Sequence, residues 1–278
     1  MKPPPFAYAR AESLEEALDL LAQGGEDAKA LAGGQSLVPA LAFRLVRPTH
    51  LVDIERVAGL DGVDPSDGRL TLGALVRHAT LTRLEDDGAR SALPAAARAI
   101  GHDAIRARGT LGGSLAHADP AAELPVVALA LDAELVLASR TGRRRVAAAD
   151  FFLGPFTTAL EPGELIVEAA FPRLPDGART AFSEFAARGG DFALACVCVG
   201  AGPGWARIAV GGVGGTPVRA PEAEALLAQG GADALEDAAE TAARELEIYG
   251  DRIAGEGYRR GLVRSLTRRA LAATLEAA

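Results

Sequence analysis

Two glycine-rich segments carry the residue types that bind phosphate groups. Leu31-Ala-Gly-Gly-Gln-Ser-Leu37 and Gly109-Thr-Leu-Gly-Gly-Ser-Leu115 each place a Gly-Gly pair beside hydroxyl or amide side chains. Glycine lets the backbone approach a ligand closely, and backbone N–H groups at a strand-to-helix junction attract an anion. Ser36, Thr110 and Ser114 have hydroxyl groups that can donate to phosphate oxygens. The pattern therefore indicates a diphosphate site.

A structural interpretation of the same segments is two tight turns that need a positive φ. Two such segments with hydroxyl neighbours in one chain favour a bound nucleotide over that alternative. Neither has the spacing G-x-G-x-x-G or G-x-x-x-x-G-K-S/T, so the usual Rossmann and P-loop sites are not predicted. The glycines at 211–215 precede Thr-Pro rather than a helix and are interpreted as a turn.

Few other motifs could catalyse a reaction or hold a metal. H-E-x-x-H and G-x-S-x-G are absent, and the four histidines lack the spacing of metal ligands. Cys196 and Cys198 alternate within an apolar strand, so we expect two buried thiols, too few for a four-cysteine zinc or iron–sulfur site. His117 follows the second glycine segment and either contacts the diphosphate or has a structural role. We predict no catalytic residue and no metal site.

Composition and charge exclude several classes of protein. With 278 residues, 49% hydrophobic and 24% charged, the chain is globular and long enough for about two domains. A net charge of −8 leaves no basic surface for nucleic acid. No apolar run approaches the roughly 18 to 20 residues that span a bilayer, and prolines near the start argue against a signal peptide. We expect a cytoplasmic protein that neither binds nucleic acid nor spans a membrane.

The first glycine segment lies between a predicted strand and a predicted helix. Ser13 and Glu16 form a capping box that predicts a helix over 13–23. A strand over 29–32 and a helix over 37–45, with Ser36 as its N-cap, flank the segment. With a strand over 50–54, these elements predict an α/β unit at 1–55.

The rest of the chain is predicted to form two further units with a boundary near 176. The second unit, 56–175, has strands and helices in mixed order, with the second glycine segment interpreted as a loop. Its expected helices are 93–105 and 120–131, and its strands are 69–72, 134–138, 145–147 and 164–171. The third unit, 176–278, is expected to have a three-stranded antiparallel sheet at 180–187, 192–200 and 205–211, followed by helices.

The glycine segments and their surroundings resemble the FAD-binding medium subunit of the molybdenum hydroxylases, the family of aerobic carbon monoxide dehydrogenase and xanthine dehydrogenase. Residues 32–36 are similar to the family's A-G-G-x-S loop and 110–114 to its T-I/L-G-G-N/S loop. The stretch Ala118-Asp-Pro-Ala-Ala-Glu-Leu-Pro125 is similar to the segment that follows in the family. The remaining similar stretches are 51–53, 105–106, 161–165 and 190–193, so the resemblance covers nearly the whole chain.

The resemblance implies an α+β fold with a two-part FAD-binding domain of the vanillyl-alcohol-oxidase or p-cresol methylhydroxylase type and a C-terminal sheet-and-helix domain. FAD would lie between the units at 1–55 and 56–175, with its diphosphate on the two glycine segments. Ala186 replaces a lysine found near the flavin in the xanthine dehydrogenase type, and Asp103 and Ala107 replace the more usual Pro and Asn.

The resemblance also implies which residues contact FAD. Glu123 would reach ribose or ribityl hydroxyls, Leu165 or Ile166 would line the flavin pocket, and Phe192 stands where the carbon monoxide dehydrogenase type has a tyrosine beside the isoalloxazine. The full implied set is Leu31, Ala32, Gly33, Gly34, Gln35, Ser36, Leu37, Ile100, Gly109, Thr110, Leu111, Gly112, Gly113, Ser114, His117, Asp119, Glu123, Leu165, Ile166, Asp191 and Phe192.

The implied function is electron transfer inside a complex. Electrons would pass from 2Fe–2S clusters in a small partner subunit, supplied by a molybdenum cofactor in a large one, through FAD to a quinone, oxygen or a nicotinamide. A dimer of heterotrimers is implied, whereas the branch with an extra iron–sulfur cluster in this subunit is disfavoured because the chain lacks the cysteines. A stand-alone FAD-dependent oxidoreductase and a non-catalytic assembly module are the alternatives.

Overall fold

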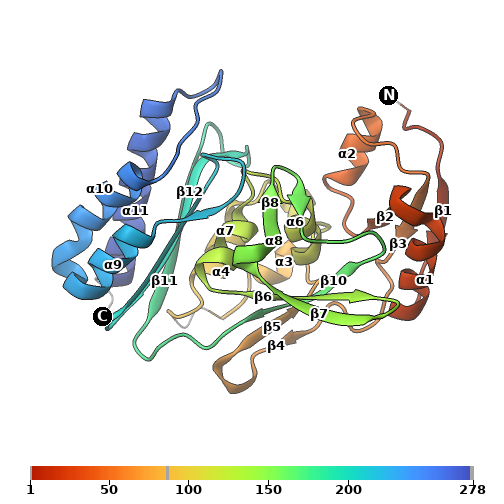
Figure 1. Cartoon of the computed structure of the whole chain (residues 1–278), viewed down its shortest axis with the longest axis horizontal. Helices are drawn as coiled ribbons and strands as arrows, with labels where there is room; N and C mark the ends of the chain where they lie inside the picture. Colours follow the sequence, from red (N-terminus) through yellow and green to blue (C-terminus); the bar gives the residue numbers. More distant parts are fainter. Residues whose placement is uncertain (1, 86–87, 276–278) are drawn as a thin grey trace.

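Within the described residues, three sheets of three or more strands follow one another along the long axis of the molecule (Figure 1). The computed structural model describes residues 2–85 and 88–275. The N-terminal part (red) and the C-terminal part (blue) lie at opposite ends, and the central sheet lies between them (Figure 1). None of the helices in these described ranges is long and apolar enough to cross a bilayer.

The N-terminal sheet is parallel and has the strand order β1-β3-β2. Its strands are β1 (Ala7–Arg10), β2 (Ala28–Leu31) and β3 (His50–Asp53), and its helices are α1 (Leu14–Gly24) and α2 (Leu37–Ala42). The predicted capping of α1 is confirmed, since the Ser13 hydroxyl accepts a hydrogen bond from the Glu16 N–H at 3.1 Å. α2 is shorter than the predicted 37–45, because Arg44 has a φ of 58° and ends the helix, and the Ser36 side chain makes no capping bond.

The central sheet is antiparallel and has the order β4-β5-β10-β6-β7. The arginines 143–145 lie on β7, at the edge of this sheet. Its strands are β4 (Val63–Asp64), β5 (Leu70–Gly73), β6 (Glu134–Ser139), β7 (Gly142–Ala147) and β10 (Leu165–Phe171). A separate two-stranded ribbon consists of β8 (Phe152–Gly154) and β9 (Thr157–Thr158).

In the part of the chain that the structure describes, six short helices accompany the central sheet. They are α3 (His78–Leu81), α4 (Ala92–Ala99), α5 (Asp103–Arg106), α6 (Leu111–His117), α7 (Glu123–Ala130) and α8 (Ala148–Phe151). The single helix predicted over 93–105 is wrong, because Ile100 is extended and Gly101 has a φ of 45°, which separates α4 from α5. α7 begins at Glu123 rather than at 120, and all of its residues are buried.

Among the described residues the C-terminal sheet has four strands, in the order β11-β12-β13-β14, which corrects the predicted three. β14 (Val218–Arg219) pairs with the end of β13 (Trp205–Gly211), and its two residues are too few to give an alternating pattern. The other strands are β11 (Arg179–Ala186) and β12 (Ala193–Gly202), and the helices are α9 (Pro221–Gly230), α10 (Leu235–Glu245) and α11 (Glu256–Leu275).

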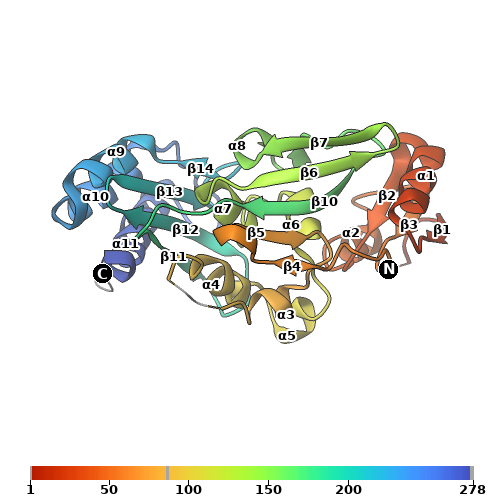
Figure 2. The same cartoon turned by 90° about the horizontal axis from the view of Figure 1, so that it is seen from below.

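The two faces of the C-terminal sheet pack against different layers. Helices α9, α10 and α11 cover the outer face (Figure 2), and α4 and α7 separate the inner face from the central sheet (Figure 1). Cys196 and Cys198 point to the inner face, where they join the central hydrophobic core as free buried thiols. This confirms the expectation of two buried thiols on one face of a strand.

Candidate cofactor site

The two glycine segments touch each other in the folded chain. A Cβ placed on Gly33 would lie 2.1 Å from the carbonyl oxygen of Arg108 and 2.9 Å from the Cα of Gly109. No side chain fits in that space, so only glycine permits this backbone contact. The first segment continues from the end of β2 in the N-terminal sheet, and the second leads into α6 of the central part, so the contact joins the two parts.

The first segment presents unpaired backbone donors. Within the described residues, the N–H groups of 33–36 make no hydrogen bond to protein. Gly34 has a φ of 72°, which turns the chain from β2 toward α2. The Gln35 amide donates to the Gly33 carbonyl at 3.1 Å, and the Ser36 side chain is exposed. Clustered free N–H groups of this kind suit an anion.

The second segment is not the loop that the sequence predicted. Thr110 is the N-cap of α6, and its hydroxyl oxygen accepts a hydrogen bond from the Gly113 N–H at 3.1 Å, so Gly112 and Gly113 lie in the first turn of the helix. A Cβ on Gly112 would lie 2.5 Å from the Ala74 Cβ, so this glycine serves packing against the end of β5. Gly113 is exposed and Ser114 half-buried, which leaves these two facing solvent.

His78 makes two hydrogen bonds to the second segment, a role that the sequence did not predict. Its backbone N–H donates to the Gly109 carbonyl at 3.0 Å, and its Nε2 lies 2.9 Å from the Thr110 carbonyl oxygen. Burial lowers the pKa of His78 to about 4, so the ring is neutral and donates from Nε2. A lone histidine far from the glycine motif gives no sequence signal for this contact.

Two arginines lie beside the contact between the segments. Arg77 pairs with Glu55 at 2.7 Å and also donates to the Arg108 carbonyl. Arg108 reaches the same carboxylate at 3.5 Å, and more than half of its side chain is exposed. Two cations therefore share one carboxylate, which leaves positive charge next to the glycine segments.

Residues 118–123 lead from α6 into the buried helix α7. Glu123 is only 7% exposed, and burial, followed by the nearby charge of Glu184, raises its pKa to about 8. A carboxyl group in that state can donate as well as accept a hydrogen bond, which suits the hydroxyls of a polyol chain. On the other side, Phe156 of the β8–β9 ribbon packs on the His117 ring at 5.1 Å, and its N–H donates to the Ala118 carbonyl at 3.0 Å.

Four of the other predicted residues fall into two groups. Asp191 and Phe192 lie in the exposed turn between β11 and β12, and Phe192 is 72% exposed. A Cβ on Gly190 would lie 2.4 Å from the His102 ring, so this turn rests on the segment that follows Ile100. Leu165 and Ile166 are buried in β10 and belong to hydrophobic cores. Because both side chains are buried, they could only pack behind a bound ligand.

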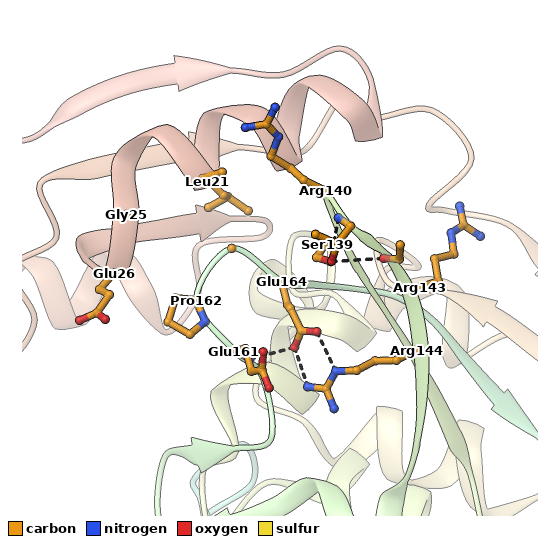
Figure 3. Close-up of a pocket in the computed structure, with 14 residues that line it drawn as sticks. Leu21, Gly25, Glu26, Ser139, Arg140, Arg143, Arg144, Glu161, Pro162 and Glu164 are labelled. Carbon is orange, nitrogen blue, oxygen red and sulfur yellow. Dashed lines mark hydrogen bonds and ion pairs between the residues drawn. The ribbon is translucent and has the colours of Figure 1, made fainter.

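A cleft of about 570 Å³ lies elsewhere, between α1 and the β6–β7 hairpin (Figure 3). None of the predicted cofactor residues lines it. Arg144 pairs with both oxygens of Glu164, at 2.7 and 2.6 Å, and Arg140 pairs with Asp19 at 2.8 Å. Carboxylates of the chain therefore already pair with these two cations.

Comparison with known families matches almost the whole chain. Residues 4–174 match the family described as "FAD binding domain in molybdopterin dehydrogenase", and residues 180–274 match "CO dehydrogenase flavoprotein C-terminal domain". The chain is 45% identical to 6-hydroxypseudooxynicotine dehydrogenase complex subunit alpha of Paenarthrobacter nicotinovorans, over 100% of this chain and 97% of that protein.

Solved structures agree with these matches. A chain of quinoline 2-oxidoreductase from Pseudomonas putida 86 superposes with a TM-score of 0.91 at 38% identity and covers 100% of this chain and 99% of its own. A chain of a carbon monoxide dehydrogenase from Hydrogenophaga pseudoflava that lacks the Mo-pyranopterin moiety superposes with a TM-score of 0.92 at 35% identity, over 100% and 99% of the two chains.

Proposed function

This chain belongs to the FAD-binding medium subunits of the molybdenum hydroxylase family, and we propose that it holds FAD where its two glycine segments meet. The observation that carries the proposal is the backbone contact of Gly33 with Arg108 and Gly109, which joins the segment with unpaired N–H groups at 33–36 to the segment that leads into the first turn of α6, where Gly113 is exposed and Ser114 half-buried. Relatives that share this architecture are subunits of oxidoreductase complexes.

The residues around the contact suit the parts of FAD. The N–H groups of 33–36 and the hydroxyls of Ser36 and Ser114 would bind the diphosphate, aided by the charge of Arg108. Glu123 would bind hydroxyls of the ribose or ribityl chain. Phe192 is an exposed ring that would pack on the flavin, in the place that the resemblance assigned to a tyrosine.

The same proposal extends to the fold and the complex. The units 1–55 and 56–175 would form a two-part FAD-binding domain of the vanillyl-alcohol-oxidase or p-cresol methylhydroxylase type, followed by 176–278. When bound, FAD would supply electron exchange between 2Fe–2S clusters of a small subunit and an external quinone, oxygen or nicotinamide. A large subunit would hold the molybdenum cofactor and choose the substrate, consistent with relatives named for carbon monoxide, nicotine and glyceraldehyde. A cytoplasmic location stays a prediction.

Isolation of the tagged full-length chain from its native cells tests the proposal. We expect two further subunits in equal amount, together with FAD, iron and molybdenum, identified by mass spectrometry, chromatography of the released flavin and elemental analysis. If the chain purifies alone and oxidises an organic substrate by itself, it is a stand-alone oxidoreductase. If the chain is folded but flavin-free in the intact complex, it is an assembly module.

A further inference from the structure

The turn between β11 and β12 rests on the side chain of His102. The Asp191 N–H donates to the Arg188 carbonyl at 3.1 Å, which closes a β-turn over residues 188–191. Gly190, the third residue of this turn, has a φ of 85°, a conformation that glycine adopts without strain. A Cβ on Gly190 would lie 2.4 Å from the Cε1 and 2.7 Å from the Nδ1 of His102. The imidazole ring therefore lies directly against the glycine backbone.

Arg106 holds the backbone from which this ring projects. Its guanidinium donates to the carbonyl groups of Ile100 and Gly101, each at 2.9 Å. The Gly101 carbonyl oxygen is a second support of the turn, since it would lie 3.1 Å from a Cβ on Gly190. Hydrogen bonds from a charged donor are stronger than those between neutral groups. The segment beneath the turn is therefore well fixed.

One short helix joins this segment to the second glycine segment. α5 begins directly after His102, and beyond its other end the Gly109 N–H donates to the Ile105 carbonyl at 2.7 Å. A helix of four residues is only about 6 Å long. The turn at 188–191 and the second glycine segment are thus attached to the two ends of α5. This arrangement brings a turn of the C-terminal domain close to the candidate diphosphate site.

Phe192 follows the turn directly, and its side chain is 72% exposed. The next residue, Ala193, is buried and begins β12, so the turn and the strand together set the direction of the ring. An aromatic ring that is already held in place loses little conformational entropy when it packs on a ligand.

We propose that His102 is a positioning residue of the cofactor site, whose ring holds the turn at 188–191 so that Phe192 is presented to the flavin. This rests on the proposed function, which gives Phe192 the flavin as its packing partner. His102 itself contacts the turn and acts on the flavin only through Phe192.

Limited trypsin digestion of the full-length chain tests whether the ring holds the turn. Arg188 is exposed and provides a cleavage site within the turn. In His102→Ala we expect cleavage after Arg188, followed by mass spectrometry of the fragments, to become about tenfold faster, because local opening costs less free energy. His102→Phe keeps a flat ring and should recover most of the protection. His50→Ala, at an exposed histidine of β3, is the matched control and should match wild type. An unchanged cleavage rate in His102→Ala overturns the proposal.

A double-mutant cycle tests the contact itself. Gly190→Ala places a methyl group against the His102 ring and also strains the positive φ. The strain is present in both backgrounds, whereas the clash requires the ring. We therefore expect Gly190→Ala to accelerate cleavage after Arg188 about fivefold less in the His102→Ala background than in the wild-type background. Equal accelerations in the two backgrounds overturn the contact.

Visible circular dichroism of bound FAD separates positioning from a general structural role. The signal reports how the protein packs around the isoalloxazine, so we expect His102→Ala and Phe192→Ala to change it in the same way. The dissociation constant of His102→Ala for FAD should rise less than about threefold, because the residues at the diphosphate are unchanged. A wild-type signal in either variant overturns the proposal. Absence of FAD binding in the wild-type chain contradicts the proposed function instead, and the digestion still tests the contact between ring and turn.

Discussion

Gly33 lies directly against Arg108, since a Cβ on Gly33 would come within 2.1 Å of the Arg108 carbonyl oxygen. The contact is between backbones, and the φ of Gly33 is not positive, so close approach is the reason for glycine at this position. It links the loop after β2 to the residues before α6. This close backbone approach holds the two halves of the candidate FAD site together.

The Gly33→Ala variant tests this contact. The added methyl group must push two backbone segments apart, so we expect the free energy of unfolding, measured in urea, to fall by about 1–3 kcal/mol. FAD binding should fall with it. Gly62→Ala is the matched control, because a Cβ there has nothing within 4 Å and should change stability little. Equal unfolding midpoints for the two variants would show that the segments do not touch.

Thr110 should stabilise the folded chain because its hydroxyl group caps α6. The Thr110→Val variant has nearly the same shape but removes the oxygen that accepts from the Gly113 N–H, so we expect a loss of about 0.5–2 kcal/mol in unfolding free energy. Thr110→Ser keeps the acceptor and should retain most of the stability. If valine and serine behave alike in urea unfolding, the cap is not formed.

Ser36 and Ser114 are the hydroxyl groups that remain available for a diphosphate. Each Ser→Ala change should weaken FAD binding by about 0.5–1.5 kcal/mol, a factor of roughly 2 to 12, with the thermal unfolding midpoint unchanged. Ser66→Ala, in the turn between β4 and β5, serves as the control. Wild-type affinity in both variants would remove these hydroxyls from the site.

The buried His78 should lower the free energy of unfolding at acidic pH. Its folded pKa of about 4 lies below the unfolded value, so between about pH 6.5 and pH 4 only the unfolded chain takes up the proton, and stability falls as the pH falls. Between pH 7 and pH 5, protonation of this histidine in the unfolded chain should lower the free energy of unfolding by about 2 kcal/mol. The His78→Gln variant should lack that part of the fall in urea unfolding. An unchanged pH slope would mean that His78 is accessible to protons when folded.

Local signals made much of the fold predictable. The Ser13 and Glu16 capping box starts α1 where the sequence places it, because cap chemistry needs only neighbouring residues. The errors arose where the sequence pattern gives no clear signal. The helix breaks after Ala99, where Gly101 has a φ of 45° and lies close to Ile105, and the two residues of β14 pair with β13.

The candidate site also has some features that the sequence predicts and others that it does not. Both glycine motifs are visible in the sequence, as is Glu123 beside them. Their contact at Gly33 and Arg108 and the hydrogen bonds from His78 join residues that are distant in the chain. A single sequence has no pattern that reports such pairs, so they required the structure.

The most direct test is a titration of the folded, full-length chain with FAD, followed by fluorescence quenching and circular dichroism. We expect saturable, stoichiometric binding that is weakened by both Ser36→Ala and Gly33→Ala. A chain that is folded by circular dichroism and shows no saturable quenching at micromolar FAD would contradict the assignment of the glycine segments as a cofactor site.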